Sequence, residues 1–473
     1  MRLFGHYVAR PVAAVAALDA ILFLGLLHLF SLGKYCSSCY VGAFLDLKPL
    51  ESLTLTAIFL VISISVGVYN RDALQDFRTF LKRYLLAWHL ILLSAVAVVA
   101  VTKATAHLPF GWYVGILTIA IATFMAIQFG VRALLFSGRN TELLKKRVLV
   151  MGDGPAAEAV VAYLNGAGGS HLAFAGCASP RQSSRPSPST SGNLAVAHAE
   201  ERRSTVLTDL AETARADMVV VAVEDKRGLA VDELLECKFR GVEVVDALTF
   251  WEREAGEIDF ARTGEGWLVF TDGFVLDARK RAVKRAFDFL VSLAFLILFL
   301  PVILVVALAV KLESPGPVIY RQERVGRDGK VFEVWKFRSM RTDAESDGVP
   351  RWAAVADDRI TRVGRIIRKL RLDEIPQIVN VLRGEMSFVG PRPERAYFTE
   401  QLCKQIPHYD LRHKVKPGIT GWAQVNFPYG ETLEDSKRKL AYDLYYVKNC
   451  DLVLDLAIIA QTVRVVLFAH GAR

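Results

Sequence analysis

Two adjacent carboxylates, Asp373 and Glu374, stand in a basic part of the chain, just before Pro376. A proline at this place favours the first turn of a helix, and carboxylates near a helix N-terminus are favourable in any protein. Four arginines lie near the pair in the sequence: Arg368, Arg371, Arg383 and Arg392. Carboxylates with perturbed pKa values cluster in catalytic sites and also in structural networks. The pattern suits a carboxylate that acts on a phosphorylated, metal-bound substrate, while a structural role stays open.

Other polar side chains are spaced so that they could hold such a substrate. Arg392 lies between two prolines, and arginine is suited to bidentate recognition of phosphate. Lys336 and Arg338 are two residues apart in a strand-like run, so they point to the same face. The glycine-punctuated segment Lys414–Asn426 contains Gln424 and an aromatic residue, which suits a base or a sugar ring. The alternative for that segment is a tight turn before a strand.

Three short elements are expected to position these residues. The segment Gly316–Phe337 has the alternation of a β-hairpin. Thr361–Leu372 predicts a basic amphipathic helix, of the kind that lies in a membrane interface with its apolar side down. Gln377–Leu382 predicts the helix that follows the carboxylates.

The composition indicates a membrane protein. Of 473 residues, 52% are hydrophobic, and the formal net charge is +9. Such a charge favours anionic lipid, phosphates or nucleotides as partners. No helix-turn-helix, RNA-binding or zinc-finger pattern is present, so nucleic acid is not an expected partner. Cys36 and Cys39 form a C-x-x-C pair without a thioredoxin-like context, and we interpret them as incidental thiols rather than a redox pair.

The first third of the chain predicts a four-helix transmembrane bundle over residues 1–140. Four apolar runs have nearly the length of a membrane span: Pro11–Leu32, Leu53–Tyr69, Tyr84–Val101 and Trp112–Phe136. Lys and Arg concentrate before the first run, after the second and after the fourth, whereas the opposite loops are poor in them. This asymmetry places both ends of the bundle in the cytoplasm.

Residues 141–250 have the strand–helix alternation of a small Rossmann-like domain of the nucleotide- or CoA-binding kind. Its glycine turn, Gly152–Ala157, resembles a phosphate-binding turn, but no acidic residue follows at the distance that a ribose contact needs. We therefore favour a regulatory or structural domain over a nicotinamide-using enzyme. Thr208 is a plausible N-cap for one of its helices. Ser179–Asn193 is a low-complexity loop.

A further apolar run, Arg279–Leu312, is long enough to span a membrane. Pro301 stands in its middle, where it kinks or breaks a helix, and both flanks are basic. Basic flanks are typical of the cytoplasmic side, so the run either crosses as a kinked span or bends and leaves by the face it entered.

Several motifs together resemble the bacterial polyprenyl-phosphate phosphoglycosyl transferases, the membrane sugar transferases that initiate exopolysaccharides and related glycans. They occur in the family's order: Lys336–Met340, Leu372–Glu374, Ser387–Pro393, Lys416–Trp422 and Asp443–Val447. The resemblance covers the chain from about Lys280 onward, and the preceding bundle and Rossmann-like domain resemble the family's long members.

The resemblance implies a two-step reaction with Mg²⁺ bound at Asp373. Asp373 attacks the sugar-bearing phosphate of a nucleotide-diphospho-sugar, with Glu374 assisting, and polyprenyl phosphate then takes the phospho-sugar. UDP-hexose is the expected donor. Six residues are expected to bind substrate: Lys336, Arg338, Arg368, Arg392, Gln424 and Asp443. The long form also favours a homodimer by analogy.

This reaction favours re-entry of the apolar run over a crossing. With four preceding spans, a fifth would place the catalytic region away from its cytoplasmic donor. The family's helix breaks at a Ser-Pro pair, and here Leu300 replaces the serine while Pro301 remains.

The expected fold is thus a membrane α bundle, an α/β Rossmann-like domain, a connector over 251–278 and a mixed α/β catalytic domain over 279–473 whose re-entrant helix occupies 285–312. The expected location is the bacterial inner membrane, with the catalytic domain on the cytoplasmic face. Two alternatives stay open: a membrane-anchored NAD-dependent sugar oxidoreductase, and a non-catalytic membrane scaffold or regulator.

Overall fold

The computed structural model describes residues 2–3, 6–7, 10–32, 48–69, 77–102, 110–135, 145–166, 172–178, 206–223, 227, 229–258, 271–274, 277–342, 359–427 and 432–468. The pair Cys36 and Cys39 and the predicted loop Ser179–Asn193 lie outside these residues.

The four predicted apolar runs form helices of one bundle. They are α1 (Arg10–Leu32), α2 (Pro49–Val66), α3 (Phe77–Thr102) and α4 (Phe110–Leu135), preceded by the short antiparallel pair β1 (Arg2–Leu3) and β2 (His6–Tyr7). Phe23, Phe59 and Phe124 meet at the bundle centre, with ring centroids 4.7–5.1 Å apart. A helix satisfies its own backbone hydrogen bonds, which is what an apolar membrane interior demands.

Four described helices are long and apolar enough to cross a membrane: Pro49–Val66, Phe80–Ala100, Val114–Val131 and Ala278–Glu313. In α1 the shorter stretch Val15–Leu29 is apolar. These helices mark the chain as a membrane protein.

The α/β domain has the predicted parallel sheet. Its elements are β3 (Lys146–Met151), α5 (Pro155–Asn165), β4 (Leu172–Ala178), α7 (Val206–Thr213), β5 (Met218–Val221), α8 (Val231–Phe239), β6 (Glu243–Asp246) and α9 (Ala247–Phe250). The strands lie in the order β4-β3-β5-β6, all parallel. The central strands are buried on both faces, which explains their unbroken apolar sequence.

Two details of this domain bear on the predictions. Thr208 does not cap a helix, because it lies inside α7 and is buried, so that prediction was wrong. Gly152 has φ +148°, and a Cβ there would come within 2.3 Å of the carbonyl oxygen of Ala222. The first glycine of the predicted phosphate turn is therefore required by close packing of β3 against the end of β5, whether or not a ligand binds.

The remaining elements form the mixed α/β domain that carries the predicted site. They are a π-helix (Trp251–Ala255), α11 (Ala278–Glu313), β7 (Ile319–Val325), η6 (Arg327–Gly329), β8 (Val331–Phe337), α12 (Arg362–Lys369), η7 (Leu372–Glu374), α13 (Gln377–Arg383), β9 (Ser387–Val389), α14 (Ala396–Gln405), η8 (Tyr409–Lys414), β10 (Gly418–Thr420), α15 (Trp422–Asn426), α16 (Leu433–Asn449) and α17 (Leu452–Phe468). Strands β7 and β8 form the predicted hairpin, and β9 pairs with β10 in parallel.

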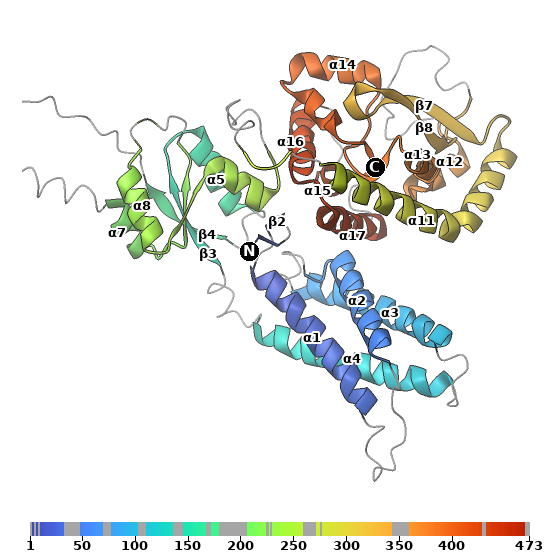
Figure 1. The fold of residues 1–473 in the computed structure, drawn as a ribbon, viewed down its shortest axis with the longest axis horizontal. Coiled ribbons are helices and arrows are strands. Elements are labelled where there is room, and N and C mark those ends of the chain that lie inside the picture. Colours follow the sequence, from blue (N-terminus) through green and yellow to red (C-terminus); the bar gives the residue numbers. More distant parts are fainter. Residues whose placement is uncertain are drawn as a thin grey trace, which may run out of the picture.

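Helix α11 is one helix of 36 residues that contains Pro301. In Figure 1 its olive first part runs along the base of the domain, and its yellow last part turns upward to reach β7. In the first half, Arg285 donates to the carbonyl oxygens of Val381 and Leu382, at 2.5 and 2.7 Å. In the second half, Val306 and Val310 pack against β8 and α12. Both halves therefore contact the same domain.

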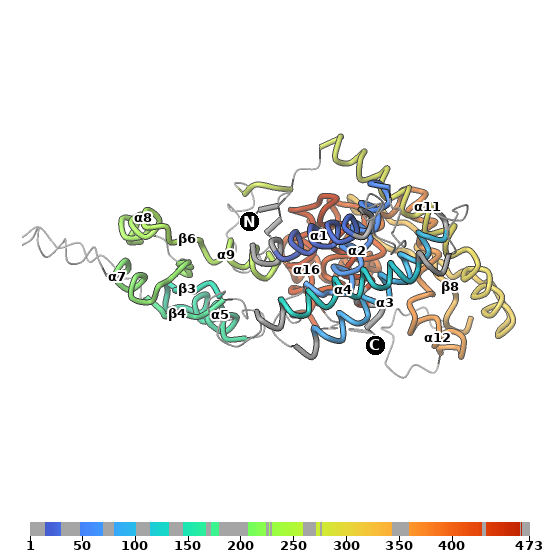
Figure 2. Tube along the Cα trace, turned by 90° about the horizontal axis from the view of Figure 1, so that it is seen from below, coloured from blue at the N-terminus to red at the C-terminus, as the bar shows by residue number. Residues whose placement is uncertain are grey.

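The bundle lies beside this domain, where α17 packs against α2. Figure 2, seen from below, shows the bundle across the catalytic domain and the α/β sheet to one side. The π-helix after β6 links the two soluble parts, because Glu252 on it forms an ion pair with Lys448 of α16 at 2.7 Å. The predicted connector is thus anchored to the domain that follows it.

The side chain of Arg338, a predicted substrate-binding residue, contacts the C-terminal end of α11. It is buried, and its guanidinium donates to the carbonyl oxygens of Val310, Ser314 and Pro315 at 2.7–3.3 Å. These are acceptors at the C-terminal end of α11, which have no partner within the helix. Gly316 permits the approach, since a Cβ there would lie 2.3 Å from Arg338. The contacts favour a structural role in holding the end of α11.

We expect Arg338→Met to lower the thermal unfolding midpoint of the detergent-solubilised chain by several degrees, because each hydrogen bond from a charged donor contributes about 1.5–3 kcal/mol. Arg365→Met on the exposed face of α12 is the matched control and should leave the midpoint unchanged. Equal midpoints for the two variants would exclude the structural role.

Candidate active site

The two carboxylates lie in a short 3₁₀ turn between two helices. Thr361 caps α12, its hydroxyl accepting from the amide of Gly364 at 2.9 Å. The helix ends before Arg371, whose φ of +57° lies in the left-handed region. This conformation costs a non-glycine residue about 1–2 kcal/mol, and such strain is often found at functional sites. The 3₁₀ turn follows at once, and Asp373 is buried within it.

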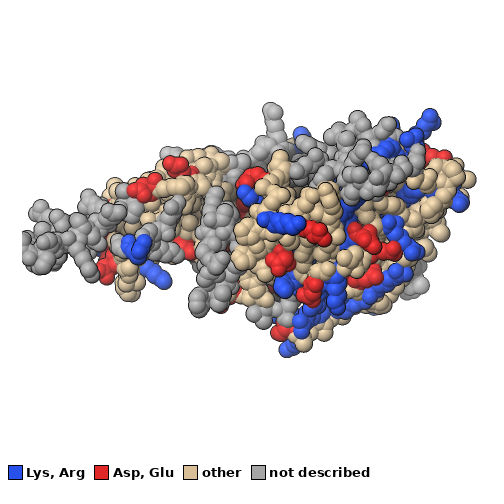
Figure 3. All heavy atoms as spheres, turned by 90° about the horizontal axis from the view of Figure 1, so that it is seen from above, with Lys and Arg blue, Asp and Glu red and all other residues tan. Residues whose placement is uncertain are grey.

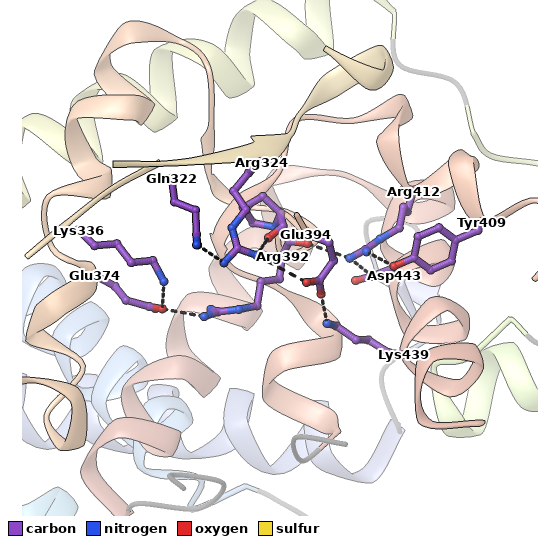
Figure 4. A network of polar contacts seen from close by, with 11 residues as sticks. Gln322, Arg324, Lys336, Glu374, Arg392, Glu394, Tyr409, Arg412, Lys439 and Asp443 are labelled. Atoms are coloured by element: carbon purple, nitrogen blue, oxygen red, sulfur yellow. Dashed lines mark hydrogen bonds and ion pairs between the residues drawn. The ribbon is translucent and has the colours of Figure 1, made fainter. Parts of the chain in front are cut away.

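Glu374 is held by two cations from distant parts of the sequence. Its Oε1 atom lies 3.1 Å from Nζ of Lys336 on β8 and accepts from Arg392 at 2.7 Å. Figure 4 shows the Lys336 and Arg392 side chains converging on this oxygen from two directions. Three residues that the sequence predicted for the site are therefore brought together.

The two neighbouring carboxyl groups have opposite pKa shifts. Burial, and then the charge of Glu374, raise the pKa of Asp373 to about 6, against the opposing effect of Lys336, Arg368 and Arg371. Burial alone would also raise the pKa of Glu374, but Arg392 and Lys336 outweigh it and hold this pKa well below its usual value. Within this coupled pair the two cations favour the ionised form of Glu374, and Asp373 has the higher pKa.

Arg368 is the other predicted residue whose charge acts on Asp373, since it lowers the pKa of this carboxyl group. It lies near the end of α12, one turn before the carboxylates. The basic helix therefore contributes charge to the site as well as an exposed apolar edge, where Ile366 and Leu370 are 59% and 53% exposed.

A buried network supports the backbone of Arg392. Arg412 donates to the carbonyl oxygen of Arg392 at 2.9 Å and to the hydroxyl of Tyr409 at 2.6 Å. Asp443 pairs with Arg412 at 2.8 Å, and both side chains are almost fully buried. The predicted substrate residue Asp443 therefore lies behind Arg392, as a positioning residue, rather than beside the carboxylates (Figure 4).

Glu394 belongs to the same network of charged side chains. It pairs with Lys439 of α16 and with Arg324 of β7. Burial alone would raise its pKa, but Lys439, Arg412 and Arg324 lower it to about 2. Glu394 thus holds cations of β7 and α16, while Asp443 holds the arginine that donates to the backbone of Arg392.

Gln424 lies on α15, and its Nε2 atom donates to the carbonyl oxygen of Ile419 at 3.2 Å. Its Oε1 atom is buried and has no hydrogen-bond partner among the described residues. The contacts of Gln424 stay within its own loop, and its predicted role toward substrate stays a prediction.

Sequence reasoning missed Arg412 and Asn380. Asn380 donates to the carbonyl oxygen of Glu333 at 2.6 Å and accepts from the amide of Trp335 at 3.0 Å, so it joins α13 to β8 beside Lys336. Neither residue belongs to a pattern with recognisable spacing, because their partners are distant in sequence.

The carboxylate pair could hold a magnesium ion together with substrate. Among the described residues no three His, Cys, Asp or Glu side chains gather as metal ligands. Mg²⁺ is commonly bound by one or two carboxylates plus water and substrate phosphates, so this donor set fits it. Asp373 is the better ligand of the two, since Glu374 already accepts from two cations.

These features define a class of site. A buried carboxylate of raised pKa, beside an anion fixed by Lys and Arg, marks a candidate catalytic site, and a carboxylate there can act as a general base or as a covalent nucleophile. The long apolar helix on the same domain places that chemistry at a membrane.

Comparison with known proteins agrees with this class. A family profile described as "Bacterial sugar transferase" matches residues 279–469. An Aeromonas hydrophila protein named UDP-N-acetylgalactosamine-undecaprenyl-phosphate N-acetylgalactosaminephosphotransferase is 47% identical over 191 residues, which are 40% of this chain and 45% of that protein. The Escherichia coli K12 UDP-glucose:undecaprenyl-phosphate glucose-1-phosphate transferase is 49% identical over 190 residues, 40% of this chain and 41% of its own.

The matching region covers almost the full length of a shorter relative. The exopolysaccharide production protein PSS of Rhizobium leguminosarum bv. phaseoli is 45% identical over 190 residues, 38% of this chain and 93% of that protein. The chain belongs to the bacterial sugar transferase family, the polyprenyl-phosphate phosphoglycosyl transferases. The shared region is less than half of the first two relatives, and it coincides with the domain that carries Asp373.

We expect kcat/KM for donor turnover to fall as the pH drops through about 6, because a nucleophilic Asp373 must be ionised. The ionised fraction decreases by about tenfold per pH unit below the pKa, whereas an ordinary aspartate stays ionised to about pH 4. Lys336→Met should move the midpoint upward, since Lys336 lowers the pKa of Asp373.

The ionisation of neighbouring groups does not produce a change in kcat/KM near pH 6. Glu394 stays ionised across the range, and burial followed by Arg412 lowers the pKa of His413 to about 4. A profile that stays flat down to pH 4 would contradict the assignment.

Proposed function

We propose that the protein transfers a sugar phosphate from a UDP-hexose to undecaprenyl phosphate through a covalent aspartyl intermediate, initiating exopolysaccharide or related glycan synthesis. The observation that carries this proposal is the contrast between Asp373, whose pKa is near 6, and Glu374, which two cations keep ionised. Relatives named for UDP-sugar and undecaprenyl phosphate support the substrate classes.

In the first step a carboxylate oxygen of Asp373 attacks the phosphorus that carries the sugar. A new phosphorus–oxygen bond forms, the bond to the nucleoside monophosphate breaks, and the leaving phosphate takes the electron pair. Lys336 and Arg392 lie beside the carboxylates and offset the charge on the transferring group. Glu374 orients both cations, and Arg412 holds the backbone of Arg392 in place.

In the second step a phosphate oxygen of the polyprenyl acceptor attacks the same phosphorus. The bond to Asp373 breaks, which regenerates the free carboxylate and releases the polyprenyl-diphospho-sugar. Mg²⁺, held by Asp373 and substrate phosphates, would supply further charge neutralisation. The exposed apolar edge of α12 and the apolar surface of α11 favour delivery of the lipid acceptor from the membrane.

We further infer that α11 enters the membrane and returns to the same face. Both of its halves pack against one domain, as a crossing helix could not do without drawing that domain through the bilayer. Figure 3 views the domain from the side away from the bundle, where Lys and Arg alternate with Asp and Glu, a surface suited to water. The proposed location is the inner membrane, with this domain and the Rossmann-like domain on the cytoplasmic face. The homodimer stays a prediction.

Asp373→Asn should abolish formation of polyprenyl-diphospho-sugar, because an amide cannot form the covalent intermediate. The measurement is nucleoside monophosphate release and lipid product in membranes supplied with a panel of nucleotide sugars. Asp410→Asn, an exposed aspartate of the same domain, is the matched control and should retain activity. Normal turnover by a well-expressed Asp373→Asn protein would contradict the proposed mechanism.

In a chain whose six native cysteines are replaced by serine, a cysteine introduced at Lys311, near the C-terminal end of α11, tests the topology. We expect it to react with a permeant thiol reagent only, because re-entry keeps that end on the cytoplasmic side. Labelling by a reagent restricted to the periplasm would show that α11 crosses.

A further inference from the structure

A second basic pocket lies at the opposite end of α13 from Asp373. It opens between the first half of α11, η6 and the segment after η8, and has a cavity volume of about 140 Å³. Its charged lining comprises Arg281, Lys284, Arg285, Asp288, Arg327, Lys414 and Lys416. Asp373 precedes α13, whereas Arg285 binds carbonyl oxygens at the end of α13. The two sites are thus separated by this helix, which is roughly 10 Å long at its rise per residue.

The pocket has more positive charge than its carboxylates offset. Lys284 pairs with buried Asp455 at 2.6 Å, and Arg327 pairs with its neighbour Asp328 at 3.1 Å. Within the described part of the chain, Arg281, Lys414 and Lys416 have no carboxylate partner. Asp288 is already engaged by the hydroxyl of Ser387 and the amide of Phe388.

The like charges in the pocket affect the pKa of Lys416. Burial, and then the charge of Arg285, lower the pKa of its ammonium group, against the attraction of Asp288. An anion in the pocket would relieve this repulsion, and phosphate is the anion that a cluster of Arg and Lys recognises best.

The pocket continues into an apolar ridge on α11. Arg281, Arg285, Phe289, Leu293 and Ile297 follow one another at intervals of four, so they form one row along the helix. The guanidinium of Arg285 lies 6.0 Å from the ring centroid of Phe289. The three apolar members are 43%, 39% and 67% exposed. A ligand with a phosphate at one end and a hydrocarbon chain at the other would match both parts.

We propose that this pocket binds the phosphate headgroup of a membrane lipid whose chain lies along the Phe289–Ile297 ridge. The proposal rests on the membrane placement of α11 proposed above. It adds a lipid site separate from Asp373, one that holds a phosphate lipid at the catalytic domain while the donor reacts.

The test measures lipid retained by the full chain released from nanodiscs into native mass spectrometry. The nanodiscs contain phosphatidylcholine with either undecaprenyl phosphate or phosphatidylglycerol as the minor component. We expect Lys416→Gln and Arg281→Gln each to weaken retention of the minor lipid by roughly fivefold, the effect of one basic residue near an anionic surface. Preference for undecaprenyl phosphate would identify an acceptor site, and preference for phosphatidylglycerol an anionic phospholipid site.

Lys437→Gln on the exposed face of α16 removes the same charge outside the pocket lining and is the matched control, with retention expected to be unchanged. Phe289→Gln tests the ridge without changing charge and should also weaken retention. Arg281→Gln and Phe289→Gln are checked for nucleoside monophosphate release in a single turnover, which should stay at the wild-type level.

Three outcomes would overturn the proposal: equal retention in all variants, displacement of the lipid by soluble nucleoside monophosphate or inorganic phosphate, or loss of donor turnover in step with lipid loss. The last two would make the pocket part of the donor site. If the wild-type chain retains lipid but releases no nucleoside monophosphate, the proposed reaction fails while the lipid site stands.

Discussion

Two carboxylates buried side by side repel each other, and this repulsion organises the domain around Asp373. Desolvation makes each charge costly, so one of them must be compensated from outside the turn. Glu374 is compensated by Lys336 from the hairpin and by Arg392 from a loop between two prolines. Burial, and then the charge of Glu374, raise the pKa of Asp373. The positions of β8, α13 and the Arg392 loop all serve to bring those two cations to one oxygen atom.

The cations themselves need support, because long side chains lose conformational entropy when they are fixed. Asn380 ties β8 to α13, and Arg412 with Asp443 and Tyr409 ties the backbone of Arg392 to η8 and α16. Removing one partner from such a buried pair would leave an uncompensated charge, which is more costly than losing an exposed one. The network explains why residues remote from the carboxylates are integral to the site.

The membrane helix is joined to this core at both halves. Arg285 and Asp288 bind the end of α13 and the start of β9, and Arg338 holds the other end of α11. The helix is therefore part of the same framework as the carboxylates. Its basic first turns line a pocket rich in cations, and α13 connects this pocket to the carboxylates.

The sequence by itself determined the elements and the nature of the site. The apolar runs, the β-hairpin and the parallel sheet follow from hydrophobic periodicity, which is local and therefore readable along the chain. The motifs around Asp373 and Arg392 pointed to the family for the same reason, since their residues are close in sequence. Among the predicted substrate residues, Lys336 and Arg392 do converge on Glu374.

Only the tertiary structure decided which charges meet. Arg338 contacts the end of α11, and Asp443 pairs with Arg412 behind Arg392, while their predicted roles toward substrate stay predictions. Thr208 was expected to cap α7 and lies inside it, because packing against the sheet outweighs the capping preference. Helix α11 continues through Pro301, since contacts of both halves with one domain fix its path. Each of these outcomes depends on partners tens of residues away, and local sequence patterns carry no information about such pairs.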